Sequence, residues 1–83
     1  MSAIICLAKV IVDTAIFLEF TPDGQLNEDL AIEMMEQLSA ELQGLSESER
    51  QNLATLFKNL STQIDDVEKR AFVEELAESW GLI

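Results

Sequence analysis

The sequence predicts an all-α fold, a compact bundle of three to four helices that forms a single domain over residues 1–83. Apolar residues recur at intervals of three and four in successive stretches of the chain, which places them along one face of an α-helix. Glycine, proline and helix-capping residues stand between these stretches, as short connections between helices require. Apolar residues make up 48% of the chain, which is enough to form the small core of a domain of this length.

The first expected helix covers residues 3–20, although β-branched residues are frequent there and favour a strand. No glycine or proline interrupts this stretch, its alternation is poor, and one apolar stripe has helical spacing. The stripe consists of Ile4, Leu7, Ala8, Ile11, Ala15 and Leu18. Further apolar residues continue nearly all the way around, so that only Lys9 and Asp13 mark a polar strip. Such a helix is normally enclosed by its neighbours. The alternative is that part of its surface contacts another chain.

The second expected helix follows a turn. Pro22-Asp23-Gly24 is typical of a tight turn, because proline presets φ and glycine accepts a positive φ. Asn27 is then positioned to cap the helix, and Gly44 to end it. The apolar face expected between them consists of Leu30, Ala31, Met34, Met35, Leu38 and Leu42.

A capping box predicts the start of the third helix. Ser46 and Glu49 have the spacing at which the serine side chain accepts a hydrogen bond from the glutamate amide, while the glutamate side chain accepts one from the serine amide. The apolar stripe that follows consists of Leu53, Leu56, Phe57 and Leu60.

A change of phase in the apolar pattern predicts a break between residues 61 and 66. Apolar residues up to Val67 would extend the third stripe into one long helix. The next apolar set is rotated well away from the face that holds Val67, which favours a new helix capped by Thr62 or Asp65. That set consists of Phe72, Val73, Leu76, Ala77 and Trp80. Gly81 is the expected stop.

The chain is strongly acidic, with sixteen acidic and five basic residues and a formal net charge of −11. This charge repels phosphate backbones and anionic lipid, so we expect no direct nucleic-acid binding and no membrane binding. It favours fast association with a basic protein. Lys9, Asp13 and Glu19 interrupt the apolar first twenty residues, which argues against a signal peptide and a membrane span. The single cysteine, Cys6, excludes a disulfide within the chain, so we expect a cytoplasmic location.

Groups that carry catalysis are largely missing. Without histidine there is no Ser-His-Asp or Cys-His pair, and one cysteine cannot make a zinc site. We expect Cys6 to be a buried, inert thiol. The acidic stretch from Asp23 partly matches a calcium loop, but Glu28 stands where that loop needs glycine and Met34 where it needs glutamate. We therefore expect no metal, no cofactor and no enzymatic activity.

Two helices carry acidic residues on the side away from their apolar stripes. These residues are Asp29, Glu33 and Glu36 on the second helix, and Glu68, Glu74, Glu75 and Glu78 on the last. A charged outer face is often only a solvated surface. A helix face that serves solubility alone, however, usually carries both acidic and basic residues, whose i,i+4 pairs slightly stabilise the helix. The acidic faces of these two helices lack such pairs. The seven residues are therefore the candidate binding site for a basic partner.

One long stretch resembles a known group of proteins. It is "IFLEFTPDGQLNEDLAIEMMEQLSAELQGLSESERQNL", with an aromatic-acidic segment (Phe17 to Phe20) before an acidic turn, and a helix ending in "ELQGLS" before "ESER". A hydrophobic-acidic segment ending in Gly-Leu closes the chain. The sequence thereby resembles small acidic bacterial proteins encoded beside polymorphic or type VI secretion toxins.

This resemblance implies an immunity protein that binds a cognate toxin. Together with the acidic faces, it predicts neutralisation by occlusion, in which the acidic surface covers a basic active-site cleft. The alternative is a small acidic adaptor or regulatory protein-binding module, a homodimer packed through its first helix.

Overall fold

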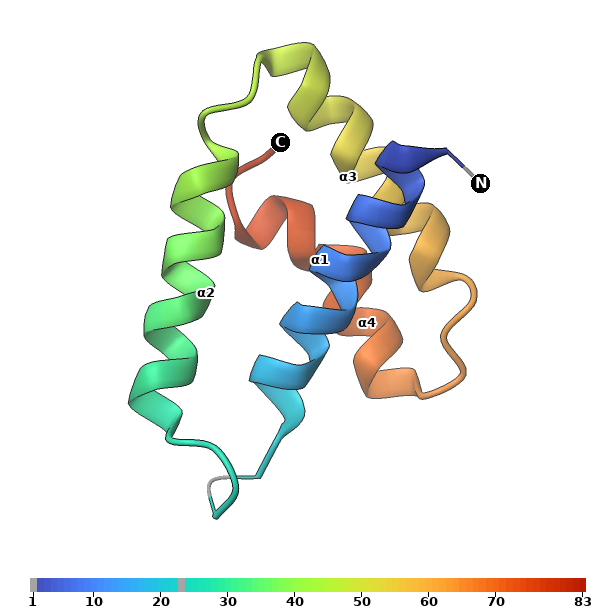
Figure 1. The fold of residues 1–83 in the computed structure, drawn as a ribbon. Helices are drawn as coiled ribbons and strands as arrows, with labels where there is room; N and C mark the ends of the chain where they lie inside the picture. Colours follow the sequence, from blue (N-terminus) through green and yellow to red (C-terminus); the bar gives the residue numbers. More distant parts are fainter. Residues whose placement is uncertain (1, 23) are drawn as a thin grey trace.

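Four α-helices joined by short connections make up the computed structural model of the chain, which describes residues 2–22 and 24–83 (Figure 1). They are α1 (Ala3–Phe20), α2 (Glu28–Leu42), α3 (Glu47–Ser61) and α4 (Val67–Ser79). α1 contacts each of the other three helices, and α3 and α4 share the most extensive contact. None of the described residues lies in a strand, so the predicted all-α fold is confirmed, as is the single helix over residues 3–20.

The connection between α1 and α2 contains the predicted turn. Asp23 lies outside the described residues. On its C-terminal side, the amides of Gln25 and Leu26 donate to the Pro22 carbonyl oxygen, at 2.9 and 3.2 Å. The turn thereby brings the start of α2 back toward the end of α1, as Figure 1 shows at the bottom of the view.

Side chains cap α2 and α3 as the sequence predicts. Asn27 Oδ1 accepts a hydrogen bond of 3.1 Å from the Leu30 amide. Ser46 Oγ accepts from the Glu49 amide at 3.2 Å, and the Ser46 amide donates to Glu49 Oε1 at 2.9 Å. These bonds satisfy amides that have no partner within the first turn of a helix.

The predicted break between α3 and α4 is confirmed, but both predicted caps are wrong. Asp66 caps α4, because its Oδ1 accepts a hydrogen bond of 2.9 Å from the Lys69 amide. Thr62 instead ends α3, where its hydroxyl donates to the Asn59 carbonyl oxygen at 2.7 Å. Asp65 lies in the connection between the two helices, and α4 begins at Val67, directly after its cap Asp66.

Arg70 holds this connection in place. Its Nε donates to the Ile64 carbonyl oxygen at 2.8 Å and its Nη2 to the Asp65 carbonyl oxygen at 3.2 Å. The guanidinium thus satisfies two carbonyl groups that no helix can pair. The spacing of apolar residues does not reveal a side chain that bonds backbone carbonyl groups. The break between the helices could therefore be predicted, but the residue that caps α4 could not.

The core lies between α3 and α4, with α1 across them. Phe57 and Val73 are completely buried, and Leu76 is 1% exposed. The Phe57 ring meets the indole of Trp80 edge to face, with centroids 6.4 Å apart and planes at 83°, a favourable arrangement of aromatic rings. Trp80 therefore anchors the end of α4 to the core, as the helical pattern predicts.

Gly81 ends α4 in the left-handed conformation, with φ of 73°. Its amide donates to the Glu78 carbonyl oxygen at 3.1 Å, and the Leu82 amide donates to the Ala77 carbonyl oxygen at 2.8 Å. This pair of bonds is a Schellman motif. It turns the chain so that Leu82 enters the core at 3% exposure. Gly44 stands at the predicted end of α2 but has no positive φ.

α1 is not enclosed by its neighbours, so the expected burial of the whole helix is wrong. The helix buries a line of small side chains, Ala8, Val12 and Ala15, which let it lie close to the rest of the domain. The opposite side stays open, and Leu7 of the predicted stripe is 62% exposed. Cys6 lies toward this open side and is exposed, so the prediction of a buried thiol is also wrong.

α2 buries less of its apolar face than the spacing predicts. Ala31 is buried and Met35 and Leu38 are partly buried, whereas Leu30 is 61% and Met34 is 38% exposed. The main contact of α2 is with α1, and one neighbour covers only a narrow part of a wide apolar face. The remainder of that face is open.

Candidate functional site

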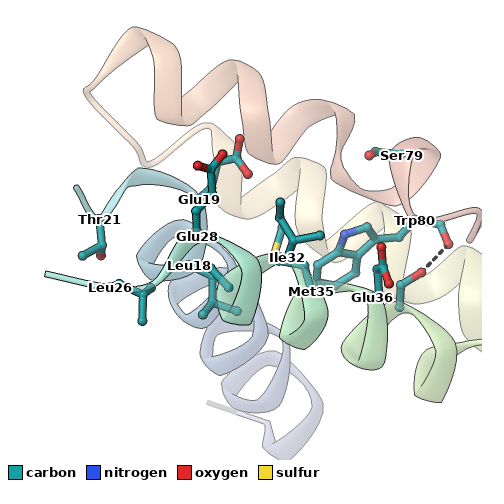
Figure 2. A pocket seen from close by; sticks show the side chains of 12 residues that line it. Leu18, Glu19, Thr21, Leu26, Glu28, Ile32, Met35, Glu36, Ser79 and Trp80 are labelled. Carbon is teal, nitrogen blue, oxygen red and sulfur yellow. Dashed lines mark hydrogen bonds between the residues drawn. The ribbon is translucent and has the colours of Figure 1, made fainter. Parts of the chain in front are cut away.

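A groove of about 410 Å³ lies where the end of α1, one side of α2 from Glu28 to Ser39 and the end of α4 meet (Figure 2). We call it the Trp80 groove. Its apolar lining is contributed by Leu18, Leu26, Ile32, Met35 and Trp80, and its acidic lining by Glu19, Glu28 and Glu36. In Figure 2, Ile32 and Met35 lie beside the indole, Glu36 lies toward the same end, and Glu19 and Glu28 lie toward the other.

The chain connection explains why carboxylates converge here. Glu19 is the second-last residue of α1 and Glu28 is the first of α2. The turn after Phe20 folds these two helix ends toward each other, so both side chains reach the same groove. Glu28 also stands in the first turn of α2, where a negative charge is favoured by the helix dipole.

No cation compensates these carboxylates within the part of the chain that is described. Neither lysine nor arginine lines the groove. The ion pair present in residues 2–22 and 24–83 lies elsewhere, between Lys9 Nζ and Asp13 Oδ2 at 2.9 Å on α1. A concave apolar surface rimmed by charges of one sign concentrates a potential that attracts the opposite sign. The groove therefore combines an apolar surface with negative charge that no basic side chain of its lining neutralises.

Hydrogen bonds from α2 hold one wall of the groove in place. The Trp80 carbonyl oxygen accepts from Ser39 Oγ at 3.2 Å, the bond dashed in Figure 2, and from Gln43 Nε2 at 2.7 Å. Gln43 Oε1 in turn accepts from Arg50 Nη1 at 3.3 Å. Trp80 is 7% exposed, so it forms a fixed and largely buried part of the groove lining.

The seven acidic residues predicted from the sequence are all exposed, but they do not form a single site. Glu36 lines the Trp80 groove. Asp29 and Glu33 line no groove, but they precede Glu36 at the spacing of one helix side. Glu68, near the start of α4, also lines neither concave surface.

The remaining three predicted residues lie in a second concave surface. Glu74, Glu75 and Glu78 line a hollow of about 530 Å³ against the end of α3, together with Lys58 and Ile83. The lysine makes this hollow less uniformly acidic than the Trp80 groove. It also lacks an aromatic side chain, so it offers a partner charge with little apolar contact.

Sequence reasoning missed two of the three groove carboxylates, Glu19 and Glu28. Glu19 was considered only as a charge that interrupts the apolar first twenty residues, and Glu28 only as a mismatch to a calcium loop. The available signal was their position on either side of a tight turn, since residues that flank a turn between antiparallel helices are close in space. Trp80 was predicted correctly as a core anchor, but not as a groove wall.

A third surface is apolar. Leu7, Val10 and Phe17 are 62%, 60% and 57% exposed and lie on the side of α1 opposite its buried line. We call these three residues the outer face of α1. Large apolar side chains gathered on one side of a helix are typical of a contact with another chain.

Residues 2–22 and 24–83 contain no group of three or more Asp, Glu, Cys or His side chains arranged to hold a metal ion. No helix among them has both the length and the apolar character needed to cross a membrane.

Comparison of the chain with protein-family models, curated proteins and solved structures found no match.

Proposed function

We propose that this chain is an inhibitor of the immunity type, which binds a basic bacterial toxin and blocks it by covering its active-site cleft. The observation that carries the proposal is the Trp80 groove, where three carboxylates without a cation surround an apolar floor. The resemblance to small acidic proteins encoded beside secreted toxins supports the same role. No catalytic step is part of the proposal.

The groove suits a side chain that is apolar along its length and positive at its tip. An apolar group can lie against Met35, Ile32 and the edge of Trp80, while a lysine or arginine beside it pairs with Glu28 or Glu36. Buried aromatic contacts commonly dominate the affinity of an interface. The surrounding charge mainly raises the association rate and selects the partner.

Occlusion of the active site is expected if the toxin has a basic cleft. Enzymes that act on nucleic acids bind phosphates with clusters of lysine and arginine. The carboxylates of the Trp80 groove, from α1 and α2, would pair with these cations in place of phosphate. A net charge of −11 would also speed the encounter at low ionic strength.

The test is capture of the partner from the cells that make the protein, with two charge-reversed variants for comparison. Glu19→Lys/Glu36→Lys changes the Trp80 groove. Glu41→Lys/Asp65→Lys makes the same change of charge at exposed residues outside both concave surfaces. We expect wild type and the second variant to retain a basic protein, and the groove variant to lose it.

A second measurement assigns the function. The captured protein is expressed alone and together with each variant, and growth is measured. Growth arrest relieved by wild type and by Glu41→Lys/Asp65→Lys, but not by the groove variant, is the expected result. Equal capture by all three proteins, or a partner whose expression does not impair growth, would contradict the proposal.

A further inference from the structure

The outer face of α1 has the spacing of a helix-pairing seam. Leu7, Val10, Thr14 and Phe17 follow one another at intervals of three and four, as the inward positions of a coiled coil do. Three of them are large apolar side chains, each more than half exposed. Thr14 is partly buried, and its hydroxyl donates to the Val10 carbonyl oxygen at 2.7 Å, so it adds no unpaired donor to the seam.

This face differs from the rest of the surface in its charge. Between Ser2 and Leu18 the charged residues are Lys9 and Asp13, which pair with each other, so the face carries no net charge. α2 also exposes apolar side chains, but it carries five acidic residues and no basic one. A basic protein is therefore attracted to other parts of the surface. A second copy, itself at −11, meets the least repulsion here.

We propose that the outer face of α1 pairs with the same face of a second copy in an antiparallel, two-fold symmetric dimer. An antiparallel pair centred on residue 12 sets Leu7 opposite Phe17 of the second copy. A parallel pair would instead align the two helix dipoles, which is unfavourable.

The size of the face sets the strength of the dimer. α1 has 18 residues, so it is about 27 Å long, and a contact one helix wide covers roughly 300 Å² on each copy. Stable interfaces cover about 800 Å² on each partner. The dimer is therefore weak and transient.

Salt should affect the affinity of self-association and the affinity for a basic partner in opposite directions. Added salt screens the repulsion between two acidic copies, while the apolar contact itself persists. Self-association should therefore strengthen as salt is raised. Binding of a basic partner weakens under the same change, because there the charges attract. The inference does not rest on the proposed function, and the two can fail separately.

The test is sedimentation equilibrium of the purified chain from micromolar to low-millimolar concentration, at low and high salt. Val10→Glu adds one charge to the centre of the face, where the symmetry of the pair counts it twice. Val67→Glu is the matched control, since Val67 is an equally apolar side chain, 74% exposed, on α4. Wild type and Val67→Glu should dimerise alike, and Val10→Glu should bind itself at least about tenfold more weakly.

Circular dichroism checks that each variant is folded, and Leu7→Lys replaces Val10→Glu if that variant is not. A wild-type chain that stays monomeric at low-millimolar concentration in high salt would overturn the proposal. Equal weakening by the outer-face variant and Val67→Glu would overturn it too. Oxidation tests the orientation, because an antiparallel pair keeps the two Cys6 residues about 18 Å apart along the axis. Rapid disulfide formation within the dimer would refute that arrangement.

Discussion

Gln43 Nε2 donates a hydrogen bond of 2.7 Å to the backbone carbonyl oxygen of Trp80. The bond joins the end of α2 to the end of α4, two segments far apart in the chain. α2 has few other contacts outside α1. Together with the bond from Ser39, the Gln43 bond helps to fix α2, and with it one wall of the Trp80 groove, relative to α4.

Replacing Gln43 with alanine should lower the free energy of unfolding by about 1 kcal/mol, the typical net contribution of one hydrogen bond. The loss should not be larger, because Ser39 Oγ still donates to the same carbonyl oxygen. Urea unfolding followed by circular dichroism measures it. Gln37→Ala is the control, since Gln37 bonds only the exposed Glu41 among the described residues. Equal losses in the two variants would show that the contact to Trp80 contributes nothing.

Gly81→Ala should destabilise the domain by about 1–2 kcal/mol, because its φ of 73° is costly for a residue with a Cβ atom. Gly44→Ala provides the comparison, since Gly44 ends α2 without a positive φ. A Cβ there would lie 3.2 Å from the Glu41 carbonyl oxygen, a tight contact but not a strained backbone. Thermal unfolding of both variants should rank Gly81→Ala as the more damaging, and the reverse order would contradict the Schellman motif.

The capping box of α3 predicts a pH dependence of stability. The hydrogen bond from the Ser46 amide, assisted by the Ser46 side chain, holds the pKa of Glu49 below its ordinary value. A carboxylate whose pKa is lowered by folding stabilises the domain above its unfolded pKa, and that contribution is lost as pH falls through the folded value. Glu49→Gln keeps a side-chain acceptor in the capping box but removes the charge.

The wild type should therefore lose more stability than Glu49→Gln as pH falls through the range where carboxylates titrate, roughly pH 5 to 3. Melting temperatures of the two proteins at matched pH measure the difference. Parallel curves over the whole range would mean that the charge of Glu49 is not coupled to folding.

Charge reversal in the second concave surface tests whether its carboxylates serve a partner. Glu74→Lys/Glu78→Lys lowers the net negative charge of an acidic domain, which favours stability, although Lys58 lines the same hollow and offsets part of that gain. Stability should therefore be unchanged or slightly higher. Association with the basic partner should be slower and less dependent on salt.

Glu33→Lys/Glu36→Lys is the matching variant on α2. It should slow association more than the α4 variant, because Glu36 lines the Trp80 groove. Stopped-flow binding at low and high salt compares the three proteins. Wild-type rates for both variants at low salt would mean that the acidic residues are only solvated surface.

The local structure of this chain could largely be predicted from its sequence. Helix caps depend on a few neighbouring residues, so Asn27 and the Ser46–Glu49 box were located correctly. Apolar spacing predicted three to four helices and the break after α3. The cap of α4 could not be identified, because Arg70 fixes the preceding connection through backbone carbonyl groups that a residue pattern does not show.

The rotation of each helix was less predictable. α1 is apolar nearly all round, so its sequence does not determine which side turns inward. The small side chains of Ala8 and Ala15 decide this through close packing, which leaves Leu7 outside. The Trp80 groove was missed for a related reason. Its lining comes from three separate helices, and only their tertiary arrangement brings Glu19, Glu28 and Trp80 together.

Trp80 is the only tryptophan of a chain that contains no tyrosine, and its indole lies in the wall of the groove. The protein therefore has a single intrinsic fluorophore at the place where a partner is expected to bind. A partner side chain that binds in the groove should change the polarity around the indole and thereby shift its emission. None of the three residues of the outer face of α1 lines the groove, so self-association should leave the emission unchanged. One unlabelled sample can thus report the two events separately.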